Sequence, residues 1–83
     1  MVLIDAIYIH NSGGKTLLNT LIKSLSKIDI NNYFFLLDNR LDKGFVDSLD
    51  IVNLEFIEAS EKTRSFFYKK NHNRFKVFFC FGN

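Results

Sequence analysis

Two adjacent glycines, Gly13 and Gly14, stand between an apolar run and an amphipathic segment near the start of the chain. The apolar run covers residues 2–9, and the amphipathic segment covers residues 17–28. Glycines between a strand and a helix let the backbone turn tightly and approach a ligand closely. The helix that follows presents free N–H groups and the positive end of its dipole, which together favour an anion such as phosphate. This glycine loop is therefore the first candidate binding site.

The triplet Gly14-Lys15-Thr16 matches the end of a P-loop, but the spacing before it does not. A P-loop needs another glycine five residues before its Gly-Lys pair, and Ile9 stands at that position. The dinucleotide fingerprint G-x-G-x-x-G also fails, since only the pair Gly13-Gly14 is present. Two interpretations of the loop stay open: a small phosphate-binding enzyme built around Gly13-Gly14-Lys15-Thr16, and a tight turn that binds no ligand.

Two polar residues follow predicted strands. His10 stands at the end of the first strand, beside the glycines, and open α/β sheets bind ligands at that edge. A general-base or ligand-binding role suits its imidazole, although a surface-loop histidine is the more frequent case. Asp38 ends the second predicted strand, where it serves either as a ribose-binding acid or as the cap of a turn.

Thiol and metal chemistry have little support in the sequence. Cys80 lies within an apolar segment, and we expect it to be an inert core residue. His10, His72 and Cys80 do not have metal-ligand spacing, so no metal site is predicted. A single cysteine forms no intramolecular disulfide, which fits a reducing compartment.

Residues 66–70 (FFYKK) combine aromatic and basic side chains, with Arg64, His72 and Arg74 nearby. Residues 1–60 carry net charge −3, whereas residues 61–83 carry net charge +5. Such a segment occurs in single-strand nucleic-acid binders and in helices that lie on membranes. We favour the simpler interpretation, in which a helix packs its aromatic rings on a sheet and exposes its lysines to water.

Length and composition indicate one globular domain. The chain has 83 residues, of which 47% are hydrophobic and 16% aromatic, and this composition argues against disorder. No apolar run approaches the roughly 18 residues of a membrane-spanning helix, and Asp5 interrupts the first apolar run. We therefore expect a cytoplasmic protein.

The pattern of apolar residues predicts alternating strands and helices. Strands are expected at residues 2–9, 33–37, 51–57 and 75–81, and helices at residues 17–28 and 58–73. Residues 41–50 are ambiguous, with Phe45, Val46 and Leu49 able to form one helical turn. This alternation predicts an α/β fold, a Rossmann-like parallel sheet of about four strands with two to three flanking helices.

Residues 5–18 (DAIYIHNSGGKTLL) resemble the start of a GT-B-fold glycosyltransferase of the family 4 (group 1) type. Residues 67–71 (FYKKN) and 77–83 (VFFCFGN) resemble the helix and strand that precede an acceptor-side loop in such enzymes. The resemblance implies transfer of a hexose from a nucleotide-sugar donor to a saccharide or lipid-linked acceptor, with no further cofactor. It places Gly13 and Gly14 near the donor phosphates, with Asn11, Ser12 and Lys15 beside them, and His10 on the acceptor side.

The resemblance also implies a second domain, which holds the sugar nucleotide and has no counterpart in these 83 residues. We therefore expect residues 1–83 to be a truncated, inactive part of an acceptor-side domain. Peripheral contact with the inner face of the membrane and self-association through an exposed apolar edge are expected, and nucleic-acid binding is not. The alternative is a small α/β binding module whose basic aromatic helix contacts an anionic partner.

Overall fold

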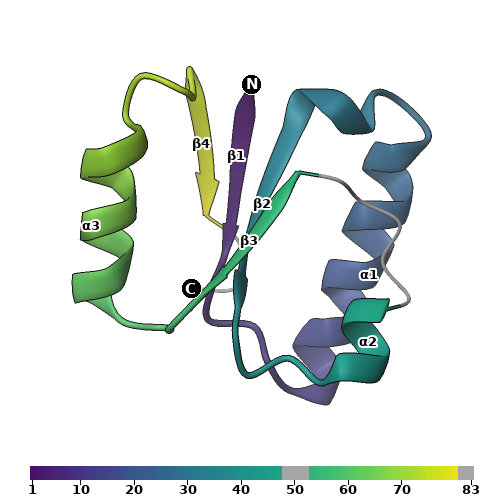
Figure 1. Ribbon diagram of the computed structural model, residues 1–83. Helices are drawn as coiled ribbons and strands as arrows, with labels where there is room; N and C mark the ends of the chain where they lie inside the picture. The colour runs from purple at the N-terminus through teal and green to yellow at the C-terminus, as the bar shows by residue number, and fades with distance from the viewer. Residues whose placement is uncertain (48–52, 81–83) are drawn as a thin grey trace.

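The computed structural model describes residues 1–47 and 53–80, which form a four-stranded parallel sheet with helices on both faces (Figure 1). The strands are β1 (Val2–Ala6), β2 (Tyr33–Asp38), β3 (Leu54–Ile57) and β4 (Val77–Cys80). The helices are α1 (Ser12–Ser26), the 3-10 helix η1 (Ile30–Asn32), α2 (Lys43–Asp47) and α3 (Glu61–Asn71). The predicted α/β, Rossmann-like arrangement is confirmed.

The strand order is β3-β2-β1-β4. The chain therefore adds β2 and β3 on one side of β1 and then crosses back to add β4 on the other side of β1. Helices α1 and α2 cover one face of the sheet, and α3 covers the other (Figure 1). Because all strands are parallel, the segments that leave β1 and β2 emerge at the same edge. This carboxyl edge, at the bottom of Figure 1, is where the candidate site residues lie.

The alternation of side chains along β1 and β2 builds a separate core on each face of the sheet. Ile4 and Phe35 belong to the core beneath α1, together with Leu18 and Ile22 of that helix. Leu3 and Phe34 belong to the core beneath α3, together with Phe67. The near-continuous apolar sequence of both strands is therefore explained by burial on both faces.

Leu or Ile at positions 17, 18, 21, 22, 25 and 28 predicts an apolar stripe that packs on the sheet, and the structure follows it only in part. Leu18 and Ile22 are buried, but Leu17 of the same stripe is 63% exposed and Ile28 is 75% exposed. Leu17 and Leu18 point about 100° apart, and only Leu18 is directed into the core, whereas Ile28 lies beyond the end of α1 at Ser26. The expectation that the whole stripe packs on the sheet is wrong at Leu17 and Ile28.

The first strand is shorter than its apolar run. β1 ends at Ala6, and the amide of Ile9 donates to the carbonyl of Ala6 (3.2 Å) in the turn that follows. Ile7 and Ile9 are nevertheless buried, so the apolar run continues through the turn because the turn packs into the core. Of the other predicted element positions, Leu49, Ile51, Val52 and Phe81 lie outside the described residues.

Strand β4 lies at an edge of the sheet and has no buried residue. Val77, Phe78 and Phe79 are each at least 41% exposed, although all three are large and apolar.

In the part of the chain that the structure describes, no helix has the length and apolar character needed to cross a membrane.

Candidate functional site

The ends of β1 and β2 bring His10 and Asp38 together at the carboxyl edge of the sheet. The imidazole Nδ1 of His10 lies 3.6 Å from Asp38 Oδ2. Asp38 is completely buried, whereas the side chain of His10 is 40% exposed. One member of this pair is thus fixed in the protein interior and the other faces solvent.

Arg40 and the backbone hold the carboxylate of Asp38 in place. The amide of Arg40 donates to Asp38 Oδ1 (2.9 Å), and Arg40 Nη2 donates to Asp38 Oδ2 (2.7 Å). The amide of Leu41 also donates to the carbonyl of Asp38 (3.1 Å), which closes a turn. The turn-capping role predicted for Asp38 is therefore confirmed, and the hydrogen bond to Asp38 raises the pKa of Arg40.

The chemistry of this pair follows from its orientation. The 3.6 Å between Nδ1 and Asp38 Oδ2 is longer than a hydrogen bond, and a closer approach would let Nδ1 donate to the carboxylate and leave the Nε2 lone pair for a ligand. A carboxylate that fixes the tautomer of a histidine in this way supports general-base chemistry. His10 can therefore accept a proton or a hydrogen bond from a hydroxyl group at the sheet edge.

The glycine loop leads directly from His10 into α1. Asn11 caps the helix, since its side-chain oxygen accepts from the amide of Gly14 (3.4 Å). Asn11 and Ser12 both have side chains that favour an N-cap, and the structure gives this position to Asn11. Ser12 begins the helix, and the structure describes its backbone alone.

The two glycines have different structural environments. A Cβ at Gly14 would lie 2.9 Å from Ile9 Cγ2, so the helix packs too closely on the preceding turn for any side chain there. A Cβ at Gly13 would meet nothing within 4 Å. Gly14 is therefore needed for packing, while Gly13 leaves the backbone of the first helical turn open to a ligand.

Lys15 forms an ion pair with Asp42, which follows β2. Its Nζ lies 2.5 Å from Asp42 Oδ2 and 5.9 Å from the centre of the Phe45 ring. The hydrogen bond from Lys15, followed by the one from the Phe45 amide, lowers the pKa of Asp42. An open hollow of about 320 Å³ lies beside this pair, lined by Lys15, Thr16, Asn19 and Phe45.

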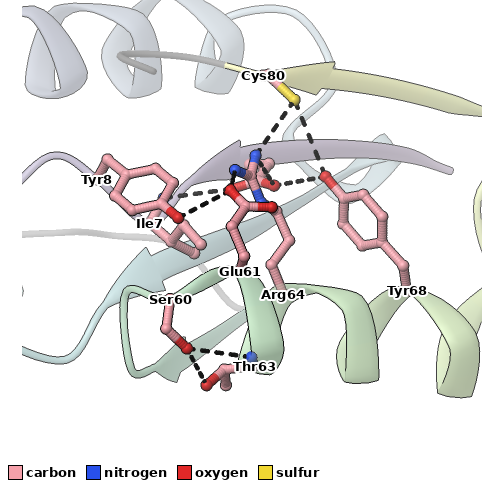
Figure 2. Close-up of polar contacts among 9 residues, drawn as sticks. Ile7, Tyr8, Ser60, Glu61, Thr63, Arg64, Tyr68 and Cys80 are labelled. Atoms are coloured by element: carbon pink, nitrogen blue, oxygen red, sulfur yellow. Dashed lines mark hydrogen bonds and ion pairs between the residues drawn. The ribbon is translucent and has the colours of Figure 1, made fainter.

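A second polar cluster, which was not predicted from the sequence, lies beneath α3. Its centre is Asp5, which is 2% exposed in the middle of β1. Asp5 Oδ2 accepts a hydrogen bond from the hydroxyl of Tyr68 (2.5 Å) and lies 3.5 Å from Arg64 Nη1. Figure 2 shows Arg64 and Tyr68 reaching from α3 towards the sheet.

Glu61 and Tyr8 complete this Asp5 cluster at its solvent side. Arg64 donates to Glu61, and the hydroxyl of Tyr8 donates to the same oxygen (3.0 Å). These two hydrogen bonds, in that order, lower the pKa of Glu61. Burial acts to lower the pKa of Arg64, but the hydrogen bond to Glu61 and the charge of Asp5 outweigh it, and the pKa is raised.

Cys80 is not the inert core residue that its apolar surroundings predicted. It is exposed, and its Sγ lies 4.0 Å from Arg64 Nη1 and 3.9 Å from the hydroxyl of Tyr68 (Figure 2). The prediction failed because β4 is an edge strand, whose outer side has no neighbouring strand in the described sheet. The signal that marks this cluster in the sequence is Asp5, a lone acid within an apolar run.

Among residues 1–47 and 53–80, no group of three or more His, Cys, Asp or Glu side chains is arranged to hold a metal ion. Comparisons of the chain with family models, with curated proteins and with solved structures find no match. The functional argument therefore depends on the geometry of the carboxyl edge and of the helix surfaces.

Proposed function

We propose that this chain is the acceptor-side part of a GT-B-type glycosyltransferase, which moves a hexose from a nucleotide-sugar donor to a saccharide or lipid-linked acceptor. The observation that carries the proposal is the contact between His10, in the loop that also contains the open Gly13, and buried Asp38 at the end of β2. The parallel sheet supports it, because ligands of open α/β sheets bind at the carboxyl edge.

In this proposal, Gly13 and the first turn of α1 face the diphosphate of the donor. The helix N-terminus stabilises the negative charge that develops as the bond between the anomeric carbon and the diphosphate oxygen breaks. Lys15 lies in the same turn, and an incoming diphosphate competes with Asp42 for its ammonium group. Asn11 keeps the helix start in position through its bond to the Gly14 amide.

His10 acts on the acceptor in the same proposal. The acceptor hydroxyl oxygen forms the new bond to the anomeric carbon, and its proton passes to Nε2 of His10. Asp38 stabilises the imidazolium that results, because its carboxylate faces Nδ1. The sugar nucleotide itself is held mainly by a second domain, so we expect the 83-residue chain to have no transferase activity. Cytoplasmic location remains a prediction.

The ligand-binding part of the proposal is tested by titrating the ¹⁵N-labelled chain with inorganic pyrophosphate and observing amide shifts. We expect the largest shifts at Gly13, Gly14 and Lys15, and weaker binding in Lys15→Met. Lys27→Met, at the other end of α1, is the matched control and should bind as the wild type does. Absence of shifts at millimolar pyrophosphate, or shifts confined to other parts of the chain, would exclude a diphosphate site in this loop.

The glycosyltransferase part of the proposal is tested on the coding DNA. We expect the DNA after the codon of Asn83 to encode a second α/β domain, in frame or behind a frameshift. An unrelated coding sequence there would contradict the proposal. Turnover of a nucleotide sugar by the 83 residues alone would contradict the expected inactivity of this chain and leave the proposed reaction in place.

A second candidate function, a binding module for an anionic partner, is favoured by the outer face of α3. Phe66 on that face is 68% exposed and is surrounded in the helix by lysines. The packing interpretation favoured from the sequence holds for Phe67, which is buried, but is wrong for Phe66. We expect salt-sensitive binding of an anionic partner by the 83-residue chain, and lack of such binding at low salt would eliminate this candidate.

A further inference from the structure

The outer face of α3 combines one exposed aromatic ring with three lysines. Phe66 is 68% exposed, and Lys62, Lys69 and Lys70 are exposed around it at helical spacing. In the part of the chain that the structure describes, none of these three ammonium groups has a hydrogen bond or ion pair. We define these four residues as the α3 patch.

The single acid of α3 is turned away from the α3 patch. Glu61 binds Arg64 and the hydroxyl of Tyr8, so its charge is directed towards the Asp5 cluster (Figure 2). Two acids lie at the rim of the patch, Glu58 beside Lys62 and Lys69 and Glu55 beside Lys70, and they offset part but not all of the charge of the three lysines. The face therefore keeps a net positive charge centred on an apolar side chain.

A shallow hollow lies against the α3 patch. Its volume is about 560 Å³, and it is lined by Glu58, Lys62, Thr63, Ser65, Phe66 and Lys69. Figure 1 shows α3 on the face of the sheet opposite α1 and α2, with the outer side of α3 directed away from the strands. The patch is thus accessible to a flat surface as well as to a small ligand.

We infer that the α3 patch binds the surface of an anionic lipid bilayer. The lysines lie against the phosphate groups and Phe66 inserts among the acyl chains, as in helices that lie in a membrane interface. This inference rests on the second candidate function and names its partner. It is independent of the glycosyltransferase proposal.

The arrangement of aromatic rings favours lipid over single-stranded nucleic acid. Nucleic-acid binders of this type stack successive bases on several exposed rings. In α3 the two other aromatic side chains are engaged elsewhere, since Phe67 is buried and the hydroxyl of Tyr68 binds Asp5. A single exposed ring among cations is suited to insertion at one point of a lipid bilayer rather than to stacking with successive bases.

The test is sedimentation of the 83-residue chain with vesicles of phosphatidylglycerol and phosphatidylcholine, and with vesicles of phosphatidylcholine alone. We expect binding to the anionic vesicles only, with loss of binding as salt is raised. Lys69→Glu should weaken binding at least about fivefold, and Phe66→Ser should weaken it as well. The matched controls are Lys27→Glu and Leu17→Ser on α1, which is on the opposite face of the sheet and where Leu17 is 63% exposed.

A parallel titration uses a fluorescent single-stranded oligonucleotide. Binding of the oligonucleotide without binding of vesicles would overturn the lipid inference and leave the binding module intact. Binding of neither would overturn both. Equal loss of vesicle binding in the α3 variants and the α1 controls would show that the α3 patch is not the contact. Circular dichroism of each variant verifies that the fold is retained, as expected for exposed positions.

Discussion

The hydroxyl of Tyr68 donates a hydrogen bond of 2.5 Å to the carboxylate of Asp5, a residue 63 positions earlier in the chain. Asp5 is 2% exposed in the central strand β1; its Oδ1 accepts from the amide of Ile7 (3.3 Å), and its Oδ2 depends on Tyr68 and Arg64 of α3. The contact joins α3 to the middle of the sheet. Several consequences for stability can be measured.

Removing the Tyr68 hydroxyl should destabilise the chain. Tyr68→Phe keeps the ring but removes the 2.5 Å hydrogen bond to Oδ2 of buried Asp5. The nearest remaining partner of that oxygen is Arg64 Nη1, at 3.5 Å. We expect a loss of about 1–3 kcal/mol in the free energy of unfolding, measured by urea denaturation. Tyr33→Phe is the matched control, because the Tyr33 hydroxyl has no hydrogen bond among the described residues. Equal effects of the two substitutions would show that the contact with Asp5 contributes little.

The same contact predicts a dependence of stability on alkaline pH. Burial, followed by the hydrogen bond to Asp5, raises the pKa of Tyr68 above its ordinary value of 10.0. The stabilisation from this phenol is therefore complete below about pH 10 and is lost as the pH rises towards the higher pKa of the folded state. We expect the free energy of unfolding to fall more steeply between about pH 10 and 11.5 in the wild type than in Tyr68→Phe. Parallel curves for the two proteins would contradict this assignment.

The two glycines of the loop should respond oppositely to alanine. Gly14→Ala places a Cβ 2.9 Å from Ile9 Cγ2, and we expect destabilisation by about 1–3 kcal/mol. Gly13→Ala meets no neighbour and lowers the entropy of the unfolded chain, so a gain of up to about 1 kcal/mol is expected. Thermal unfolding of both variants is the measurement. A destabilised Gly13→Ala would mean that Gly13 also has a packing role.

The edge strand β4 predicts self-association. Val77, Phe78 and Phe79 are exposed on a strand that has a neighbour, β1, on one side only in the described sheet. Such an edge pairs readily with another chain. We expect light scattering to show dimers or larger species at high concentration, and Phe79→Lys to shift them to monomer. Phe66→Lys, on α3, is the control and should not have this effect. A monomeric wild type at several hundred micromolar would refute the expectation.

The pattern of apolar residues was sufficient to predict the sheet and its flanking helices. Strands β1 and β2 are buried on both faces, and this leaves a clear mark in two nearly continuous apolar runs, the first interrupted only by Asp5. The cap at Asn11 and the turn at Asp38 were also predictable, because both depend on residues within a few positions of one another. Local interactions of this kind can be deduced from spacing alone.

The sequence by itself determined the α/β fold and the position of the glycine loop at the start of a helix, since periodicity and turn chemistry act over short distances. Tertiary structure alone decided that His10 meets Asp38, that Lys15 meets Asp42, and that Asp5 meets Tyr68. It also decided that Cys80 and Phe66 are exposed. The physical reason is that strand order and the placement of α3 set these contacts and exposures, and both depend on how distant elements pack rather than on neighbouring residues.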